Sequence, residues 1–241
     1  MFRKKQYYID ECKRLETANT ALMVEYEGLE KKYDELYLSW EALNDEKLPN
    51  PIEEYWNTKR LATDDYLYPA RTIINGLERV DVDTRIFFTE SDSKIPIVDG
   101  ANNDEKAYNA LKKVHDDMVY MSDTSMFKQP EEWLFAYETL ALGNGDCEDG
   151  AIFMANIMLK SGIPYWRVRL NAGDVNGGGH CWVTYLRESD DKWVILDWCY
   201  FYEDAIKGLL WKDAENYFDI WFSFNKYHIF AEDMLDKEVN E

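Results

Sequence analysis

The sequence predicts an α+β fold in which a buried helix packs on an antiparallel sheet and a long amphipathic helix precedes this core. Apolar residues occupy most positions of segment 147–160, which is typical of a helix buried on all sides. Three apolar runs follow at 165–170, 179–186 and 193–198, and the turn signals between them indicate strands. A seven-residue apolar repeat occupies the first 43 residues and predicts the long helix.

The bulk composition indicates one sizeable domain with an appendage. The chain has 241 residues, of which 46% are hydrophobic, enough to form a substantial core. The formal net charge is −20. Because nucleic-acid and anionic-membrane binders place Lys and Arg against phosphates, we expect neither partner. Such a charge favours basic substrates or cations.

The cysteine usage and the N-terminus predict a soluble protein without a signal peptide. Four cysteines in no CxxC spacing form neither a disulfide scaffold nor a zinc site. The chain opens with charged residues, and no apolar run reaches the ~20 residues that span a bilayer. We therefore expect a reducing compartment such as the cytoplasm.

The repeat predicts an N-terminal amphipathic helix over residues 1–47. Leucines recur every seven residues, and larger or polar residues follow four positions later: Leu15, Leu22, Leu29, Leu36, Leu43, then Asn19, Tyr26, Tyr33 and Trp40. Residues 8–43 could self-associate as a coiled coil, pack on the chain or on another protein, or form a mobile arm. The prolines of segment 48–51 end the helix, so we place the main domain at 52–241.

The remaining elements are predicted from periodicity. Segment 52–77 reads as mainly helical, 85–89 as a candidate strand and 105–121 as a helix. Pro130 with two acidic residues after it indicates a helix start, and Gly143-Asn144-Gly145 a break. The aromatic tail from Tyr200 is predicted to be mainly helical.

Cys147 is the candidate nucleophile because it opens the buried helix directly after a Gly-Asn-Gly-Asp break. Backbone N–H groups at a helix start favour the thiolate and lower its pKa, and they can face a developing oxyanion. The alternative is that Cys147 is a small core residue.

His180 and Asp197 complete a candidate triad through strand geometry. A turn around Glu188-Ser189 places His180 directly opposite Asp197, and a turn centred one residue later places them diagonally on the same face. In both registers the carboxylate reaches the imidazole and orients it. The alternatives are a structural histidine and an aspartate that binds a turn.

Three carboxylates surround the candidate nucleophile in the segment GDCED. Asp146, Glu148 and Asp149 offer hard oxygen ligands suited to calcium. In the alternative, which we favour, Asp146 caps the helix and the other two complement its dipole.

The segments GDCEDGAIFMANIMLKSGIP, GHCWVTYL and WVILDW together resemble the transglutaminase-like superfamily, in particular its bacterial and viral cysteine proteinases. Trp133 and the triplet Glu138–Leu140 match the upstream part of the pattern, whereas Ala136 stands where a Pro is usual. The similarity covers Pro130–Trp198, the motif-bearing core. It implies a papain-like and transglutaminase-like fold, with Cys147 as nucleophile, His180 as base and Asp197 as orienting residue. No side chain matches the family's oxyanion-hole donor, and some relatives bind calcium near the Cys motif.

The expected activity is thiol-dependent acyl transfer on a protein or peptide substrate, without a required metal or organic cofactor. Hydrolysis of a peptide or amide bond is favoured, and transamidation remains open. The alternative is a structural or adaptor protein, for example a phage virion component, which keeps the fold and binds partners through its N-terminal helix. Cys181 and Cys199 are expected to be core thiols facing away from the triad, and His115 and His228 to lie on the surface.

Overall fold

The fold was analysed in a computed structural model that describes residues 32, 60–61, 67–68, 70–74, 76–201, 203, 205, 213–217 and 219–231. From Arg60 onward, these residues belong to one unit, Asn50–Glu241. The predicted N-terminal helix and its proposed role in self-association lie outside the described residues, apart from Lys32. No described helix has the length and apolar character needed to cross a bilayer.

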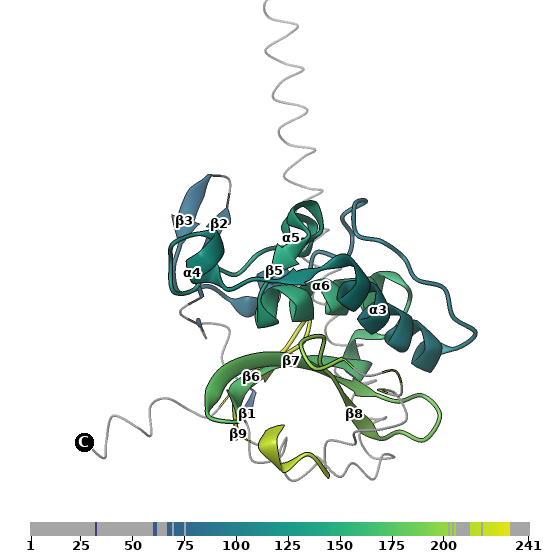
Figure 1. Cartoon of the computed structure of the whole chain (residues 1–241). Coiled ribbons are helices and arrows are strands. Elements are labelled where there is room, and N and C mark those ends of the chain that lie inside the picture. Colours follow the sequence, from purple (N-terminus) through teal and green to yellow (C-terminus); the bar gives the residue numbers. More distant parts are fainter. Residues whose placement is uncertain are drawn as a thin grey trace, which may run out of the picture. The chain divides into compact units, whose positions relative to one another are not determined.

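A six-stranded antiparallel sheet forms one layer of the unit (Figure 1). Its order is β1 (Arg60–Leu61), β10 (Ile229–Ala231), β9 (Asp219–Phe224), β6 (Val168–Val175), β7 (Gly178–Leu186) and β8 (Trp193–Leu196). β6 and β7 form a long hairpin, whose turn contains Asn176 and Gly177, both with positive φ. The central strands β6 and β7 are buried along most of their length, so the side chains that they direct to both faces of the sheet are covered.

Helices cover one face of this sheet (Figure 1). They are α3 (Asn103–Asp117), α4 (Asp123–Met126), α5 (Ala136–Leu142) and α6 (Cys147–Lys160). The short 3-10 helices are η1 (Thr84–Phe87), η2 (Tyr165–Arg167) and η4 (Glu215–Tyr217). Two small sheets lie outside the main sheet: β2 (Thr72–Ile74) pairs with β3 (Leu77–Arg79), and β4 (Val119–Tyr120) pairs with β5 (Asn144–Gly145). The result is a mixed layer architecture of helices on a sheet.

α6 is the central helix, and its bounds are those predicted from the sequence. It packs against α3 and α5 on one side and against β6 and β7 on the other. Its polar Asn156 is fully buried, with the side-chain Nδ2 donating to Phe87 O at 2.9 Å and Oδ1 accepting from Thr89 N at 2.6 Å. These bonds satisfy the amide and attach η1 to the helix.

Several predicted elements are wrong. Residues 219–224 and 229–231 of the supposed helical tail are strands, because Ile220, Phe222 and Phe224 alternate into the core. Segment 52–77 contains strand residues at 60–61 and 72–74, and the candidate strand at 85–89 is largely η1.

The boundaries of the helices next to the site also differ. The helix expected at Pro130 begins only at Ala136, since residues 131–135 run extended and Trp133 N donates to Arg71 O at 2.7 Å. The predicted break is confirmed, because Gly143 ends α5 in the left-handed region at φ 65°. The helix expected at 105–121 is α3, which ends at Asp117.

Candidate active site

Cys147 is the first residue of α6 and follows β5 after one residue, Asp146. The turn is fixed by Asp149, whose two carboxylate oxygens accept from Leu134 N at 2.8 Å and from Asp146 N at 3.2 Å. A Cβ on Gly145 would lie 2.6 Å from Asp149 Cβ, so only glycine fits there. Trp198 Nε1 donates to Cys147 O at 3.1 Å and holds the other side of the turn.

His180 and Asp197 lie in contact on the sheet side of the site. The distance from His180 Nε2 to Asp197 Oδ2 is 2.6 Å, and both side chains are largely buried. β7 and β8 pair Val183 with Leu196 and Thr184 with Ile195. This is the later-centred of the two registers considered, so the two residues lie diagonally instead of directly opposite.

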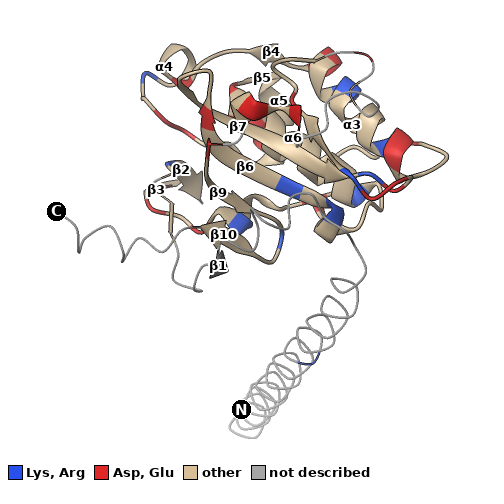
Figure 2. Ribbon diagram, turned by 90° about the horizontal axis from the view of Figure 1, so that it is seen from below, with Lys and Arg blue, Asp and Glu red and all other residues tan. Residues whose placement is uncertain are grey.

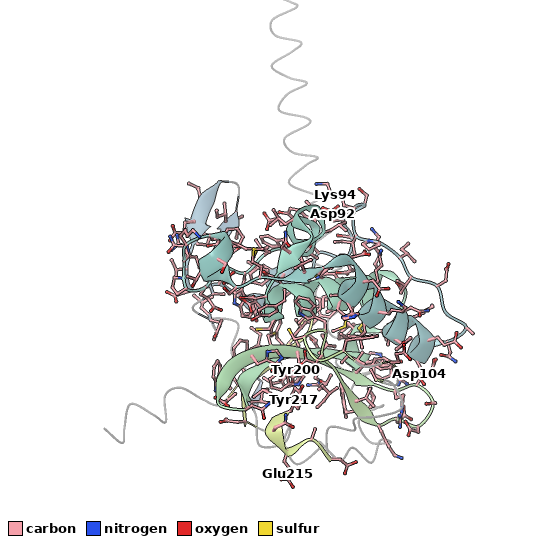
Figure 3. All side chains as sticks on the ribbon, viewed as in Figure 1. Asp92, Lys94, Asp104, Tyr200, Glu215 and Tyr217 are labelled. Atoms are coloured by element: carbon pink, nitrogen blue, oxygen red, sulfur yellow. The ribbon has the colours of Figure 1, made fainter. Side chains whose placement is uncertain are left out.

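Asp197 accepts two further hydrogen bonds that fix its orientation. Tyr217 OH donates to the same oxygen, Oδ2, at 3.0 Å, and Cys199 N donates to Oδ1 at 3.0 Å. Tyr217 belongs to η4 and is buried; Figure 3 shows it beyond the sheet as seen from the helices. A carboxylate held at both oxygens presents one fixed geometry to the imidazole.

The Cys147 thiol lies between the carboxylates and the start of β7. Its Sγ donates to Glu148 Oε2 at 3.1 Å, and the backbone N–H of Cys181, the residue after His180, hydrogen-bonds to the thiolate form. His180 in turn interacts electrostatically with Asp146, the residue before Cys147. Both residues lie in the described part of the chain, and no hydrogen bond joins the Cys147 thiol to the His180 ring.

Burial raises the pKa of the Cys147 thiol well above its usual range, and the charges of Cys181 and Asp146 add to this effect. The sequence predicted the opposite direction from the helix start alone. The difference arises because desolvation and neighbouring negative charge outweigh the helix N-terminus and the interactions of the thiol with Glu148 and the Cys181 backbone. Without a base, this thiol would stay protonated at neutral pH.

Five carboxyl groups form a cluster beside Cys147, those of Asp123, Glu131, Asp146, Glu148 and Asp149. Figure 2 shows acidic ribbon segments near the labels of α5 and α6. Potential ligand atoms lie within 4.8 Å of one another in two sets: Asp123, Asp146 and Asp149, and Asp123, Glu131 and Glu148. Burial raises the pKa of all five carboxyls, that of Asp123 to about 7 with a further contribution from the charge of Asp146.

Two oxygens of this cluster are buried and have no hydrogen-bond partner among the described residues, Asp123 Oδ1 and Asp146 Oδ1. A buried unpaired carboxylate oxygen is costly, and a bound cation would remove that cost. The hard oxygen donors suit calcium. The residues therefore fit a cation, with Asp123 and Glu131 added to the three ligands considered from the sequence.

The other predicted residues have varied surroundings. Cys181 is a buried thiol, as expected, but its backbone contacts the nucleophile. Cys199 does not face away from the triad: its sulfur lies within 4.8 Å of ligand atoms of His180 and Asp197. His115 stacks on Phe201 with ring centroids 4.1 Å apart, and the backbone N–H of His228 donates to Asn225 Oδ1.

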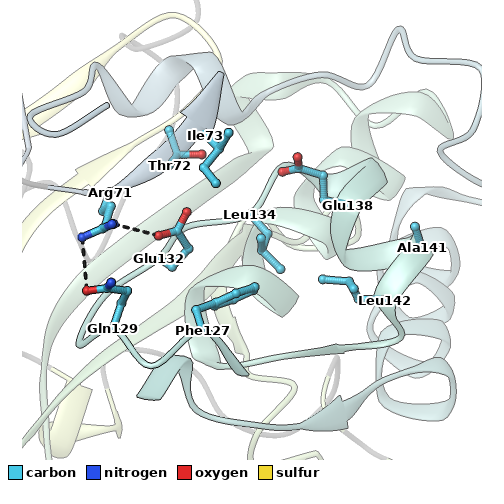
Figure 4. A pocket seen from close by; sticks show the side chains of 10 residues that line it. All are labelled: Arg71, Thr72, Ile73, Phe127, Gln129, Glu132, Leu134, Glu138, Ala141 and Leu142. Carbon is cyan, nitrogen blue, oxygen red and sulfur yellow. Dashed lines mark hydrogen bonds and ion pairs between the residues drawn. The ribbon is translucent and has the colours of Figure 1, made fainter. Parts of the chain in front are cut away.

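A separate hollow of about 500 Å³ lies between β2, the segment after α4 and α5 (Figure 4). In it Arg71 Nε lies 3.0 Å from Glu132 Oε2, and Arg71 Nη1 donates to Gln129 Oε1 at 3.2 Å. Exposed Ile73 and Leu142 make much of its wall apolar. None of the three candidate catalytic residues lines it.

Sequence reasoning missed Tyr217, Asp123, Glu131 and Tyr120 as neighbours of the site. No local pattern marks them, because each reaches the site from an element distant in sequence from the Cys and His motifs. Tyr217 was the least accessible to prediction, since the tail was expected to be helical. The acidity of segment 122–132 was visible, but only the packing of α4 against the start of α6 turns it into a cluster.

Part of this chain is similar to a known protein family. Residues 95–198 match the family described as the transglutaminase-like superfamily. This segment, which runs from before α3 to just beyond β8, is therefore a transglutaminase-like domain, and the resemblance predicted from the sequence is confirmed.

Solved structures with partial similarity include two of LapG from Legionella pneumophila. The EGTA-treated form is 18% identical over 53% of this chain and 66% of LapG, with a TM-score of 0.44. The calcium-bound form is 22% identical over 51% and 67%, with a TM-score of 0.40. A Cytophaga hutchinsonii protein provisionally described as a cysteine protease is 15% identical over 61% of this chain and 45% of its own, with a TM-score of 0.33. No curated protein matches the sequence.

Proposed function

We propose that the protein is a thiol-dependent acyl-transfer enzyme that hydrolyses a peptide or amide bond, with Cys147 as nucleophile, His180 as general base and Asp197 as the residue that orients the base. The observation that carries this proposal is the buried contact of 2.6 Å between His180 Nε2 and Asp197 Oδ2. The Cys181 backbone, next to His180, acts to lower the pKa of the Cys147 thiol. The transglutaminase-like domain over residues 95–198 supports it.

The first half of the reaction forms an acyl-enzyme. Because Nε2 of His180 is bound to Asp197, the second ring nitrogen, Nδ1, is the one that accepts the thiol proton. The sulfur attacks the carbonyl carbon, and the C–S bond forms as the carbonyl oxygen becomes an oxyanion. When the tetrahedral adduct collapses, the C–N bond breaks, and His180 returns its proton to the leaving amine.

The second half releases the acyl group. Water gives a proton to His180 and attacks the thioester, the C–S bond breaks, and the proton returns to the sulfur. Asp197, held by Tyr217 and by Cys199 N, stabilises the imidazolium in both halves. The backbone N–H of Cys147 at the start of α6 is the proposed oxyanion donor.

Cys147 must leave its contact with Glu148 before it can react. A protonated, buried thiol reacts slowly, so transfer of its proton to His180 is the step that makes the sulfur nucleophilic. This dependence makes the proposed roles testable by single substitutions.

A digestion assay tests the activity. The full chain is incubated with a proteome-derived peptide mixture, with and without an added primary amine, and products are identified by mass spectrometry. We expect new peptide termini with the wild type, none with Cys147→Ser, and full activity with the matched control Cys12→Ser. Amine incorporation without new termini would indicate transamidation instead of hydrolysis. Identical products from wild type and Cys147→Ser would contradict the acyl-transfer proposal.

We further propose that the carboxylate cluster binds calcium through oxygens of Asp123, Glu131, Asp146, Glu148 and Asp149. The support is the pair of buried oxygens without partners and the close approach of the potential ligand atoms. A bound cation would supply positive charge beside Cys147. Since the charge of Asp146 acts to raise the pKa of that thiol, the cation would oppose the increase.

A further inference from the structure

β4 presents an open backbone edge beside the candidate nucleophile. Val119 N donates to Gly143 O at 3.0 Å, and Met121 N donates to Gly145 O at 2.9 Å. Because backbone groups alternate in direction along a strand, the N–H and C=O of Tyr120 point away from β5. Within the described ranges β4 pairs only with β5, and residues 119–122 are all exposed.

This edge borders Cys147. The ring of Tyr120 lies 5.9 Å from that of Trp198, whose Nε1 donates to Cys147 O. Burial raises the pKa of the Tyr120 phenol, and the charges of Cys147 and Asp146 act in the same direction. An extended chain paired with Tyr120 would therefore run past the sulfur.

Among the described residues, the first part of β7 has a second unpaired edge near Cys147. β8 pairs with β7 only from Val183 to Leu186, so the part of β7 before Val183 extends past it. The backbone N–H of Cys181 is directed at the Cys147 sulfur. By the same alternation, the N–H and C=O of Gly179 face that side as well.

Exposed aromatic rings flank the space between the two edges. Tyr120 and Tyr200 are each 57% exposed and Trp221 is 47% exposed. The ring of Tyr200, labelled in Figure 3, lies 5.6 Å from that of His180, and Trp221 covers Gly179, where a Cβ would lie 3.1 Å from the indole. Large exposed rings beside unpaired backbone groups suit a polypeptide with varied side chains.

We propose that the substrate is an extended polypeptide segment, which adds as a strand to the Tyr120 edge of β4 and passes Gly179 on its way to Cys147. This inference rests on the proposed function and specifies its substrate class. Main-chain hydrogen bonds then provide the affinity, so flexible or unfolded segments bind and isolated amides do not.

The experiment compares two thiol-alkylating probes with the same reactive group. Chloroacetone carries no peptide, and acetyl-tetraalanyl chloromethyl ketone carries a backbone with minimal side chains. With both probes the sulfur bonds to the methylene carbon and chloride leaves. We expect the peptide to modify Cys147 at least about tenfold faster, because its backbone can form main-chain hydrogen bonds that chloroacetone lacks. In a set of peptides N-methylated at one amide each, at least one should lose this advantage.

Two variants of Tyr120 separate backbone from side chain. Tyr120→Pro removes the outward N–H and leaves the β4–β5 hydrogen bonds of Val119 and Met121 intact, whereas Tyr120→Ala removes only the ring. We expect the proline variant to lose most of the peptide's advantage and the alanine variant to keep most of it. The chloroacetone rate of each variant is the reference for its peptide rate, so a change in the reactivity of Cys147 itself cancels from the comparison.

The outcomes distinguish this inference from the proposed function. If chloroacetone modifies Cys147 selectively and with dependence on His180, but neither the peptide backbone nor N-methylation changes the rate, the strand-addition inference is overturned and the triad stands. If chloroacetone shows no such selectivity, the triad itself fails. Equal effects of Tyr120→Pro and Tyr120→Ala would also contradict recognition through the backbone.

Discussion

Gly150 is the residue of α6 at which one methyl group should disturb the site most. A Cβ at this position would lie 2.2 Å from Trp198 Nε1 and 2.3 Å from Trp198 Cε2. Such distances are far inside van der Waals contact, and Trp198 is only 5% exposed, so the indole cannot easily move aside. Any displacement would break the hydrogen bond from Nε1 to Cys147 O.

The size of the effect follows from three contributions. Overpacking a well-filled site costs about 1–3 kcal/mol, and loss of the hydrogen bond costs about 0.5–1.5 kcal/mol. Alanine is favoured over glycine within a helix by about 1 kcal/mol, which offsets part of this. We therefore expect Gly150→Ala to lower the free energy of unfolding by about 0.5–3.5 kcal/mol.

Urea unfolding with an unchanged m-value measures this loss. The matched control is Gly178→Ala, where nothing lies within 4 Å of the added Cβ; we expect it to change stability by less than about 0.5 kcal/mol. The alkylation rate of Cys147 should fall in Gly150→Ala, because its first helical turn loses the Trp198 contact. Wild-type stability of Gly150→Ala, or an equal loss in both variants, would refute the predicted clash.

Three further outcomes are expected. Tyr217→Phe removes one of the donors to Asp197 and should slow alkylation of Cys147 by about tenfold, which corresponds to about 1.4 kcal/mol, while unfolding stays cooperative. An unchanged alkylation rate would exclude a positioning role for Tyr217. Burial acts to raise the pKa of Asp104, but hydrogen bonds from Ser189, Glu188 and Tyr185 lower it on balance, so the stabilisation by this carboxylate is complete at neutral pH and is lost as the pH falls below 4 through the lowered pKa. Asp104→Asn should therefore reduce the drop in unfolding free energy between pH 7 and pH 3. An identical drop in the variant and the wild type would contradict this prediction. Calcium should raise the melting temperature of the wild type relative to EDTA, and Asp123→Asn should abolish the increase; an equal increase in both would place the ion elsewhere.

The helix that carries Cys147 could be predicted from sequence because its signal is local. An uninterrupted apolar run, an acidic start and a Ser-Gly-Ile-Pro stop define 147–160, and these are the observed bounds of α6. His180 and Asp197 could be brought together for a similar reason, since a short hairpin leaves few registers and both candidates keep the pair on one face.

The tail was mispredicted because its strands depend on distant partners. β9 lies beside β6, about fifty residues earlier in the chain, and β10 reaches back to β1. Ile220, Trp221, Phe222 and Phe224 form an almost unbroken apolar run, so the two-residue period of the side chains that face the core does not stand out in the sequence. The consequence was functional, because Tyr217 enters the site from just before β9.

The direction of the Cys147 pKa could not be predicted from the helix start either. A helix N-terminus is visible in sequence, but desolvation depends on packing against Cys181 and on carboxyls that α4 brings close. The helix N-terminus does favour the thiolate of Cys147, but burial and neighbouring negative charge outweigh its effect on the pKa.

The pH dependence of Cys147 alkylation by iodoacetamide tests the central claim most directly. Because burial raises the thiol pKa, reaction near pH 7 requires His180 to accept the proton. We predict selective modification of Cys147 at neutral pH in the wild type, a rate about 10²–10⁴-fold lower in His180→Ala, and recovery of that variant only under strongly alkaline conditions. Equal, slow modification of all four cysteines, or the same pH profile in both proteins, would contradict the catalytic assignment.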